Sequence, residues 1–449
     1  MSFSTNLTCF FSSLYTFIKN SPYKILSCLF LSDLFLNWPG NLMTDSKEQY
    51  QQAIAGIYSD HHPAMMSFLW HYLIKIYDGS GLMYLLQLAL FYGAIAFSLK
   101  SLAITQEQNP SVWKICVLLL TPLYPQIMIY TAEVVKDNQF AFSFIFVVSA
   151  LGFYTVSLKK MPIFVTLGLL LILLYGASVK YQGQFIAIIP LIWASFLLGK
   201  TLPLFKRALI FLSIAFTFYG SMELVHKALI PNIEKNHSWQ WVKLYDLAAI
   251  SLKTRQDLIP EFNKRPSFSK EKLYERYSNQ SVDAYIYFDD PIFQVTKDEM
   301  QMKVLWNTWA LEILKHPLNY IIHRSGNMGY ALLSRPGFQY VSPFLEKFLS
   351  PHTALFNTVH KVIGWIYFIF MSHLLVVFLS FIYVILALKT WGKSKSSPIL
   401  LGYSLTGLAM PCCIFFLSMA GNPRYTYICA IFCYLCHVFA FEALTCKKA

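Results

Sequence analysis

Four groups of polar residues could carry out chemistry, and each lies beside a long apolar stretch. The first group is Asp45, Glu48, His61 and His62, within residues 37–70. Asp45, Glu48 and Gln52 have i, i+3, i+7 spacing, which places them on one face of a short helix. A carboxylate there could accept a proton from a hydroxyl as a general base. Asp45 could equally cap that helix, because Asp is a common N-cap residue.

A metal is a second use for the histidines. His61 and His62 follow Asp60 directly. Imidazole and carboxylate groups are common zinc ligands, so the pair could bind a divalent cation with Asp45 or Asp60. Two adjacent histidines do not define a metal site by themselves. The sequence therefore leaves a divalent metal open and indicates no other cofactor.

The other three groups join apolar stretches through short turns. They are Glu133, Lys136 and Asp137 in AEVVKDNQF, Lys180 and Gln182 in SVKYQGQF, and Arg424 and Tyr425 in GNPRY. Lys180 and Arg424 could bind phosphate oxygens through charge-assisted hydrogen bonds. Each could instead anchor a helix end, since long basic side chains extend toward water.

One further cation lies in WALEILKHPLNYIIHR, at 309–324. This segment predicts an amphipathic helix, a break at Pro317 and a second helix that ends at Arg324. Arg324 could line a substrate cavity, or the segment could pack on a membrane surface. The chain has no P-loop, no GxGxxG after a strand, and no GxSxG or HExxH motif, so we expect no ATP-driven transport by this chain.

Composition indicates that the elements holding these groups face lipid. Of 449 residues, 56% are hydrophobic and only 13% are charged, against roughly 25% charged in soluble domains. The net charge of +13 fits basic cytoplasmic loops of a membrane protein, so we expect no nucleic-acid partner.

The apolar stretches predict an all-α polytopic membrane protein with about ten transmembrane helices. A span needs about 20 apolar residues. The predicted spans lie near 22–38, 81–103, 112–130, 138–157, 162–179, 183–199, 204–222, 362–388, 397–420 and 425–444. Residues 64–77 are too few to cross and are predicted to lie in the membrane interface. Lys and Arg then gather on one side, which predicts that both termini are cytoplasmic.

This assignment divides the chain into three parts. Residues 1–222 form an N-terminal transmembrane module, whose first external loop, 39–80, holds the candidate catalytic residues. Residues 223–361 form a large external loop. Residues 362–449 form the C-terminal transmembrane helices.

Taken in order, the motifs resemble the GT-C glycosyltransferases. The resemblance is closest to bacterial integral-membrane members related to the dolichyl-phosphate-mannose protein mannosyltransferases and the lipid A aminoarabinose transferases. It spans most of the chain and rests on WPG at 38–40, Asp45 with Glu48, HHP at 61–63, KD at 136–137, Lys180 with Gln182, HP at 316–317 and RY at 424–425.

The resemblance implies a GT-C-like fold with interfacial helices, and an inverting glycosyltransferase. The donor would be a sugar linked to polyprenyl phosphate. The acceptor would be a lipid, glycan or protein at the non-cytoplasmic face of a bacterial inner membrane, among membrane lipids.

Roles for individual residues also follow from the resemblance. Asp45, with its neighbour Glu48, would supply the catalytic base, and Asp137 would be the second acidic residue. Lys180 and Arg424 would bind the donor phosphate. The remaining candidates for substrate binding are His61, His62, Lys136, Gln182, Arg324 and Tyr425. The KDN sequence at 136–138 lacks an adjacent acidic pair, which departs from the family's pattern and puts a metal requirement in doubt.

Two other classes of protein stay open. A transporter or lipid flippase would have a similar number of spans, but it should carry ionisable residues near the middle of its helices. Asp33 is the main such residue here. A glycan polymerase or ligase would use similar chemistry, and the sequence does not distinguish it.

Overall fold

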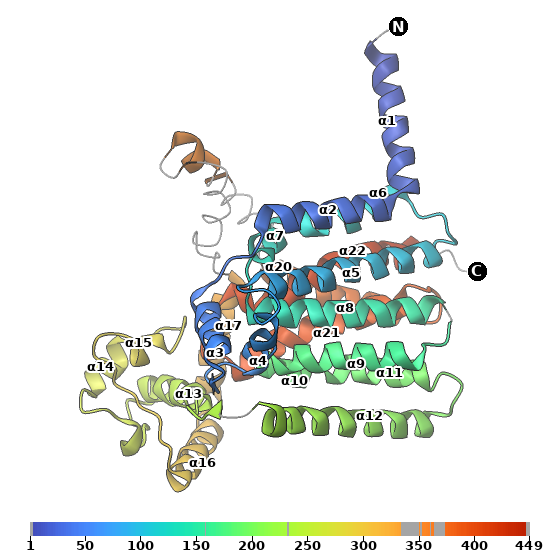
Figure 1. Ribbon diagram of the computed structural model, residues 1–449. Coiled ribbons are helices and arrows are strands. Elements are labelled where there is room, and N and C mark those ends of the chain that lie inside the picture. The colour runs from blue at the N-terminus through green and yellow to red at the C-terminus, as the bar shows by residue number, and fades with distance from the viewer. Residues whose placement is uncertain are drawn as a thin grey trace.

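The computed structural model describes residues 3–157, 159–230, 233–333, 353–359 and 373–445, together with residues 350, 361 and 362. The fold is 75% helical with almost no sheet, so the predicted all-α class is confirmed. Most of the long helices lie side by side in one bundle (Figure 1).

The helices before residue 230 are α1 (Phe3–Asn20), α2 (Pro22–Asn37), α3 (Thr44–Ala55), α4 (Met65–Leu73), α5 (Gly81–Thr105), α6 (Val112–Leu119), α7 (Pro125–Thr131), α8 (Lys136–Ser157), α9 (Ile163–Ser178), α10 (Tyr181–Ile186), α11 (Ile188–Leu198) and α12 (Leu204–Leu224). The later helices are α13 (Trp239–Thr254), α14 (Lys270–Glu275), α15 (Asp283–Ile286), α16 (Glu299–Lys315), α17 (Pro317–Leu333), α20 (His373–Lys389), α21 (Ser397–Leu417) and α22 (Pro423–Thr445).

Six helical stretches in the described part of the chain are long and apolar enough to cross a membrane. They are Gly81–Thr105, Lys136–Ser157, Tyr181–Leu198, Leu204–Lys227, Ser397–Leu417 and Pro423–Thr445. Ile163–Ser178 and His373–Lys389 are shorter apolar helices. These helices are consistent with an integral membrane protein, while the number ten stays a prediction. The predicted span 362–388 falls partly outside the described residues.

One predicted span is wrong as a continuous helix. Residues 112–130 divide into α6, a 3₁₀ turn at Thr121–Leu123, and α7. Pro122 and Pro125 cause the break, because proline cannot donate the backbone hydrogen bond that a helix interior requires. The segment 64–77 contains only the nine-residue α4, which is far shorter than a span.

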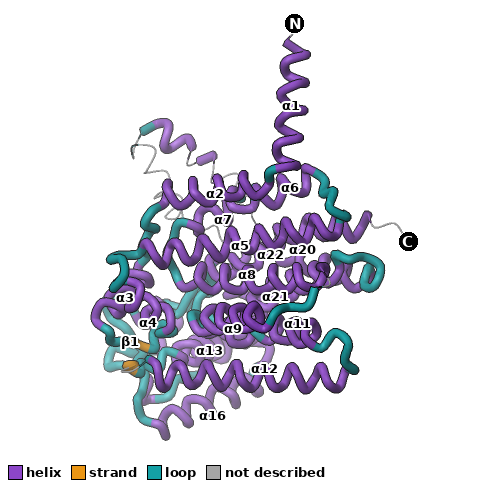
Figure 2. Tube along the Cα trace, turned by 45° about the vertical axis from the view of Figure 1, so that its right-hand side comes forward, coloured by secondary structure: helices purple, strands orange, loops and turns teal. Residues whose placement is uncertain are grey.

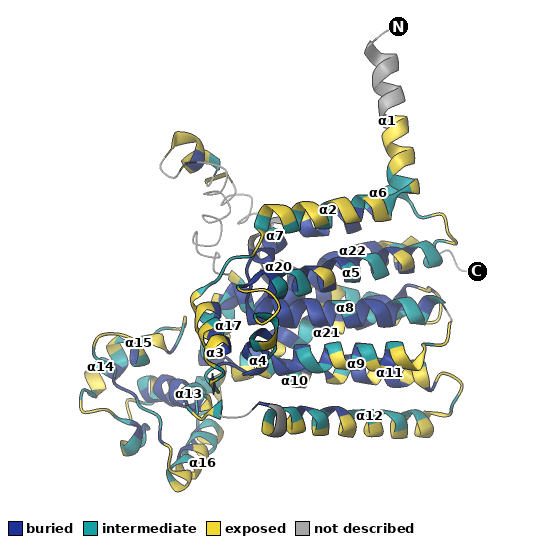
Figure 3. Ribbon diagram, in the orientation of Figure 1, coloured by how far each residue is buried: buried dark blue, intermediate teal, exposed yellow. Residues whose placement is uncertain are grey.

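Burial separates the centre of the bundle from its rim. In α8, 72% of the apolar window is buried, whereas in α12 only 11% is. Figure 3 shows the same contrast, with α8 mostly dark blue and α12 largely yellow and teal. Apolar side chains that no protein covers are expected where a helix faces lipid, so α12 lies at the outer edge of the bundle.

The large loop has a hydrophobic core of its own. Its buried members come from α13, α14, α15, α16 and the segments between them: Leu244, Tyr245, Leu247, Ala248, Ile259, Leu273, Val282, Tyr285, Ile292, Phe293 and Leu305. At the end of the loop, α17 packs against α20, α21 and α22. The loop is therefore a folded unit that is fastened to the bundle.

A two-stranded parallel sheet joins the first loop to the large loop. Strand β1 (Tyr58–Ser59) pairs with β2 (Ile233–Glu234), close to α3 and α4 (Figure 2). The short helices α3 and α4 and the helices of the large loop all lie at one end of the bundle (Figure 1). The starts of α5, α8 and α22 lie at this same end, which is where the candidate site forms.

Candidate functional site

A cavity of about 1270 Å³ opens between this end of the bundle and the large loop. Residues from all four predicted groups line it: Asp45, His61, His62, Glu133, Lys136, Lys180, Gln182, Arg424 and Tyr425. Residues that are as far apart in the chain as Asp45 and Arg424, 379 positions, contact each other here. The prediction that these groups share one face of the molecule is consistent with this geometry.

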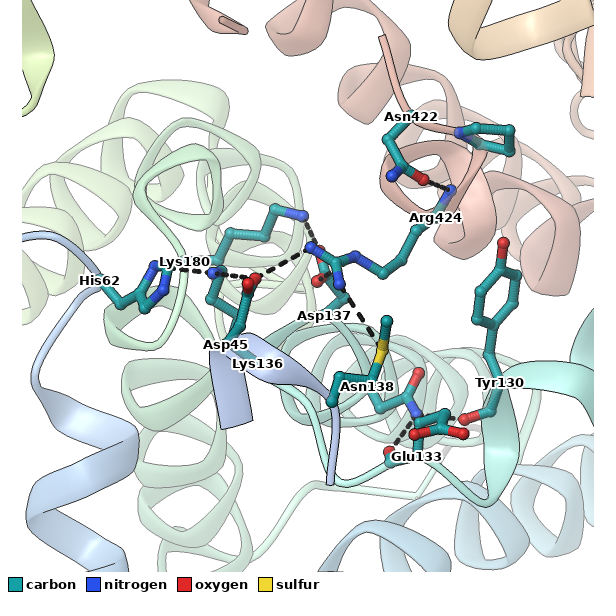
Figure 4. A network of polar contacts seen from close by, with 12 residues as sticks. Asp45, His62, Tyr130, Glu133, Lys136, Asp137, Asn138, Lys180, Asn422 and Arg424 are labelled. Carbon is teal, nitrogen blue, oxygen red and sulfur yellow. Dashed lines mark hydrogen bonds and ion pairs between the residues drawn. The ribbon is translucent and has the colours of Figure 1, made fainter. Parts of the chain in front are cut away.

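Asp45 is held by two cations rather than used as a helix cap. The N-cap of α3 is Met43, and no side chain makes a capping hydrogen bond there. Lys136 Nζ and Arg424 Nη2 each lie 3.0 Å from Asp45 Oδ2, as Figure 4 shows. The capping interpretation of Asp45 is therefore wrong.

Asp137 is the second carboxylate of this network. One of its oxygens pairs with Lys180, and the other lies 3.1 Å from Arg424 Nε. Both Asp137 and Lys180 are buried. Arg424 therefore bridges the two carboxylates, contacting Asp45 through Nη2 and Asp137 through Nε (Figure 4).

His62 extends the network toward solvent. Its Nδ1 lies 2.8 Å from Lys136 Nζ, and lysine can only donate, so Nδ1 accepts and Nε2 carries the proton. Burial, and next the charge of Lys136, lower the pKa of His62 to about 3. On the other side, Nε2 lies 3.8 Å from Oε2 of the exposed Glu48.

The charged groups of the network lie at the first residues of helices, and one glycine allows a tight turn beside them. Lys136 and Asp137 form the first turn of α8, where a carboxylate is stabilised by the helix dipole. Lys180 is the N-cap residue of α10. The tight turn there requires Gly183, since a Cβ at this position would come within 2.9 Å of Ala177 Cα.

Helix α22 places the guanidinium group of Arg424 at the cavity. Pro423 begins α22, a favourable position because proline has no N–H to leave unpaired. The backbone N–H of Arg424 donates to Asn422 Oδ1 at 2.9 Å. Lys180 Nζ lies 4.6 Å from the centre of the Tyr425 ring, a cation–π contact that helps to hold the lysine at the cavity wall.

The charges determine the ionisation of Asp45. Burial opposes its ionisation, but the charges of Lys136 and Arg424 outweigh burial and hold the pKa of Asp45 well below its ordinary value. Asp45 is thus a carboxylate at neutral pH. It is also a weak base for as long as both cations contact it.

The two aspartates do not form a metal site. Each is already paired with two cations, and a divalent cation would be repelled by the same side chains. Glu48, His61 and His62 instead place ligand atoms within 4.8 Å of one another. A metal on Nε2 of His62 would shift its proton to Nδ1, which would then face the Lys136 ammonium group. This set fits a metal only if Lys136 moves away from His62.

The sequence-predicted residues differ in where they lie relative to the cavity. Asp45, His62, Lys136, Asp137, Lys180 and Arg424 form the network, and His61, Gln182 and Tyr425 line the cavity beside it. Glu48 lies at the exposed edge of the network and not on the cavity wall. Asp137 lies behind the wall, so its contacts suit it to positioning Lys180 and Arg424.

Arg324 is not part of the site, and its prediction as a substrate-binding residue is corrected. It is fully buried, with Nη2 2.6 Å from Asp246 Oδ2 and Nη1 2.5 Å from the carbonyl oxygen of Ser418. His323 also faces Asp246, at 3.3 Å. Arg324 binds the large loop to the bundle, because α17 turns this side chain toward α13 and away from the cavity.

Sequence reasoning missed the wall of the cavity that the large loop supplies. Trp239, Lys243, Asp283 and Tyr287 line it. A signal existed for the first two, because Trp239 and Lys243 have i, i+4 spacing, which places them on one face if the segment is helical, as it is in α13. Their placement opposite the first loop depends on how the large loop folds.

Comparisons of the chain with protein-family models, with curated proteins and with solved structures find no match.

Proposed function

We propose that this protein is an inverting glycosyltransferase of the GT-C type. It moves a sugar from a polyprenyl-phosphate-linked donor to an acceptor at the non-cytoplasmic face of the membrane. The observation that carries the proposal is the ionic network, in which Lys136, Lys180 and Arg424 hold Asp45 and Asp137 at a cavity beside the ends of apolar helices.

The location suits a donor that is half lipid. A polyprenyl chain stays in the hydrocarbon region, whereas its phosphate and sugar need a polar cavity at the membrane surface. The exposed aromatic residues Tyr181 and Phe185 of α10 lie on the cavity wall. They provide a border between the lipid-facing bundle and the cationic network.

The charge balance suits a phosphate leaving group. Three cations face two carboxylates, which leaves one positive charge in excess within this group of five. Arg424 and Lys180 can donate hydrogen bonds to phosphate oxygens. The same contacts stabilise the negative charge that develops on the phosphate as it leaves.

The reaction step has a defined electron and proton balance. The acceptor hydroxyl oxygen forms a bond to the anomeric carbon, and the bond from that carbon to the phosphate oxygen breaks. The electron pair of that bond leaves with the polyprenyl phosphate. The hydroxyl proton goes to the carboxylate of Asp45.

Donor binding would also make Asp45 a stronger base. A donor phosphate competes with Asp45 for Arg424. As this cation turns toward the phosphate, the pKa of Asp45 rises from its depressed value, because an interaction that lowered it is shared. Asp45 then becomes a better base only when donor is present.

The test is transfer from a panel of polyprenyl-phosphate-linked sugars by membranes that contain the protein. We expect Asp45→Asn to reach the membrane in normal amount and to lose about 10²–10⁴-fold of the transfer rate, the usual contribution of a general base. The matched control is Asp289→Asn, which changes an exposed acid that does not line the cavity and should transfer at the parental rate.

Two results would contradict the proposal. One is the absence of donor consumption above that of membranes lacking the protein, across the whole panel. The other is a transfer rate for Asp45→Asn within a few-fold of the parent, which would remove Asp45 as the base.

A further inference from the structure

A lysine on the loop side of the cavity is surrounded by tryptophans. Lys243 Nζ lies 3.9 Å from the ring centre of Trp306, and 4.6 Å from those of both Trp239 and Trp309. Trp239 and Lys243 belong to α13, and the other two rings belong to α16. Lys243 is only 7% exposed, yet it lines the cavity together with Trp239.

This cation forms no close ion pair with a carboxylate of the described residues, although the charge of Asp246 acts on it from farther away. None of their carboxylates forms an ion pair with Lys243, in contrast to Lys136, Lys180 and Arg424. The nearby Asp246 is already engaged, since Arg324 Nη2 lies 2.6 Å and Trp309 Nε1 lies 2.8 Å from its Oδ2.

Aromatic rings stabilise an ammonium group without neutralising it. The ring faces attract the cation through their quadrupoles, but its full positive charge stays available to an anion. Burial lowers the pKa of Lys243 to about 8, so the group is still mainly protonated at neutral pH. A buried, unneutralised cation at a cavity wall is an arrangement that an anionic ligand completes.

We propose that Lys243 is a second anion-binding site of this cavity, separate from the network around Arg424. It takes a phosphate or carboxylate group, and the partly exposed ring of Trp239 packs against the sugar ring or apolar part that carries the anion. The site draws on α13 and α16, whereas the first network draws on α3, α8, α10 and α22.

This site indicates the class of acceptor. The donor phosphate is assigned to Arg424 and Lys180, so the anion at Lys243 belongs to the acceptor, which is therefore an acidic lipid, glycan or peptide. Assigning the anion to the acceptor rests on the proposed function. The existence of the anion site does not.

Binding of inorganic pyrophosphate to the full-length protein in nanodiscs tests the site, with isothermal titration as the measurement. Lys243→Met keeps the length of the side chain and its contact with the rings but removes the charge. The parent protein should bind pyrophosphate at two classes of site. We expect Lys243→Met to abolish binding at one class, or to weaken it by about tenfold to a hundredfold. The matched control is Lys253→Met, which removes an exposed charge from the same helix and should bind as the parent does.

The same titration separates this inference from the proposed function. Arg424→Gln should remove the other class of binding and leave the class that depends on Lys243. If Lys243→Met binds pyrophosphate like the parent, the anion site is refuted, whatever Arg424→Gln does. If only Lys243→Met loses binding, the donor site fails and the anion site stands.

A measurement on the unchanged protein tests the same site without depending on whether a variant folds correctly. Acylation of lysines in the unchanged protein, followed residue by residue with mass spectrometry, should slow at Lys243 by about tenfold or more when pyrophosphate is present. The rate at Lys253 should not change. Equal rates at Lys243 with and without pyrophosphate would overturn the inference.

The lipid composition of the nanodiscs identifies the source of the anion. If anionic headgroups of the bulk membrane occupy the site, pyrophosphate should bind it more weakly in discs with phosphatidylglycerol than in discs of phosphatidylcholine alone. If the affinity is the same in both, the ligand is a distinct acceptor and not the bulk lipid.

Discussion

The stability of the protein depends on both partners of the Lys180–Asp137 pair, because both side chains are buried. Removing Lys180 leaves the buried Asp137 carboxylate compensated only in part, by Arg424 at 3.1 Å, in a low-dielectric environment. We expect Lys180→Met to lower the stability of the protein by up to about 3–5 kcal/mol, the cost of a buried charge that has lost its partner. Lys180→Met combined with Asp137→Asn should recover most of this loss but no transfer activity. Thermal unfolding in nanodiscs measures both effects.

An exposed pair provides the control for that experiment. Lys227 and Glu223 lie one helical turn apart and are both largely exposed. Lys227→Met should leave the melting temperature unchanged, because water screens such pairs. A large loss for Lys227→Met, or no recovery in the double variant, would show that burial does not set the energetics of the Lys180 pair.

The pKa of His62 makes stability depend on pH in a defined window. Folding lowers this pKa from 6.5 to about 3. Below pH 6.5 the unfolded chain takes up a proton that the folded protein does not, so stability is lost as the pH falls toward 3. The slope from one such group is at most about 1.4 kcal/mol per pH unit.

His62→Asn tests this window, because its amide oxygen can still accept from Lys136 and it does not titrate. The variant should lose less stability than the parent between pH 6.5 and pH 4. Melting temperatures measured across this range give the comparison. Parallel curves for parent and variant would show that the proton balance at His62 does not contribute.

Residue types could be predicted from the sequence, but their pairing could not. A charged residue at the end of an apolar stretch is conspicuous, which is why Asp45, Lys136 and Arg424 could all be found. Which carboxylate meets which cation depends on packing between helices that are far apart in the chain. Arg324 illustrates the failure, since it pairs with Asp246, 78 positions away, and nothing in the local sequence reports this.

At the scale of elements, Asp60 links the first loop to the large loop, and these two loops enclose the cavity. Its carboxylate accepts from the backbone N–H of Asn236 at 2.6 Å and of His237 at 3.3 Å. Its carbonyl oxygen accepts from the Tyr181 hydroxyl at 2.7 Å. The carboxylate bonds therefore hold β1 beside β2, and with them the start of α13.

Asp60→Ala should loosen this fastening. It leaves two backbone donors without their partner, at a cost of about 1–3 kcal/mol. We expect limited proteolysis to cut residues 233–238 faster than in the parent. Asp289→Ala, at an exposed acid, should not change the rate. Equal cleavage in all three proteins would mean that the β1–β2 pairing holds the loops by itself.

The prediction of elements was accurate where apolar length alone decides and poor where proline intervenes. The stretches that became α5, α8, α21 and α22 were recognised from length and hydropathy. Residues 112–130 are also mostly apolar, but Pro122 and Pro125 divide them into two helices with a 3₁₀ turn between them. The core of the large loop was not predictable from periodicity, because many of its residues come from the short helices α14 and α15 and from irregular segments.

At the scale of the whole molecule, the two ends of the bundle should face opposite sides of a membrane. The cavity and the large loop lie at one end, whereas α8 finishes and α9 begins at the other (Figure 1). Lys270 in the large loop and Lys159 between α8 and α9 are both exposed. In a background without native cysteines, Lys270→Cys should react with a membrane-impermeant maleimide in intact cells, and Lys159→Cys only after lysis. Labelling of both in intact cells would show that the assignment of sides is wrong.

The position of Arg424 on α22 has a consequence for the order of synthesis. Asp45, Lys136, Asp137 and Lys180 are all made before α20 begins, and among them two positive charges balance two negative ones. Arg424, made hundreds of residues after Asp45, adds the excess positive charge and the bridge between the carboxylates. A nascent chain therefore holds a neutral and incomplete site until α22 enters the membrane. The network around Arg424 should acquire its affinity for phosphate only at that last step.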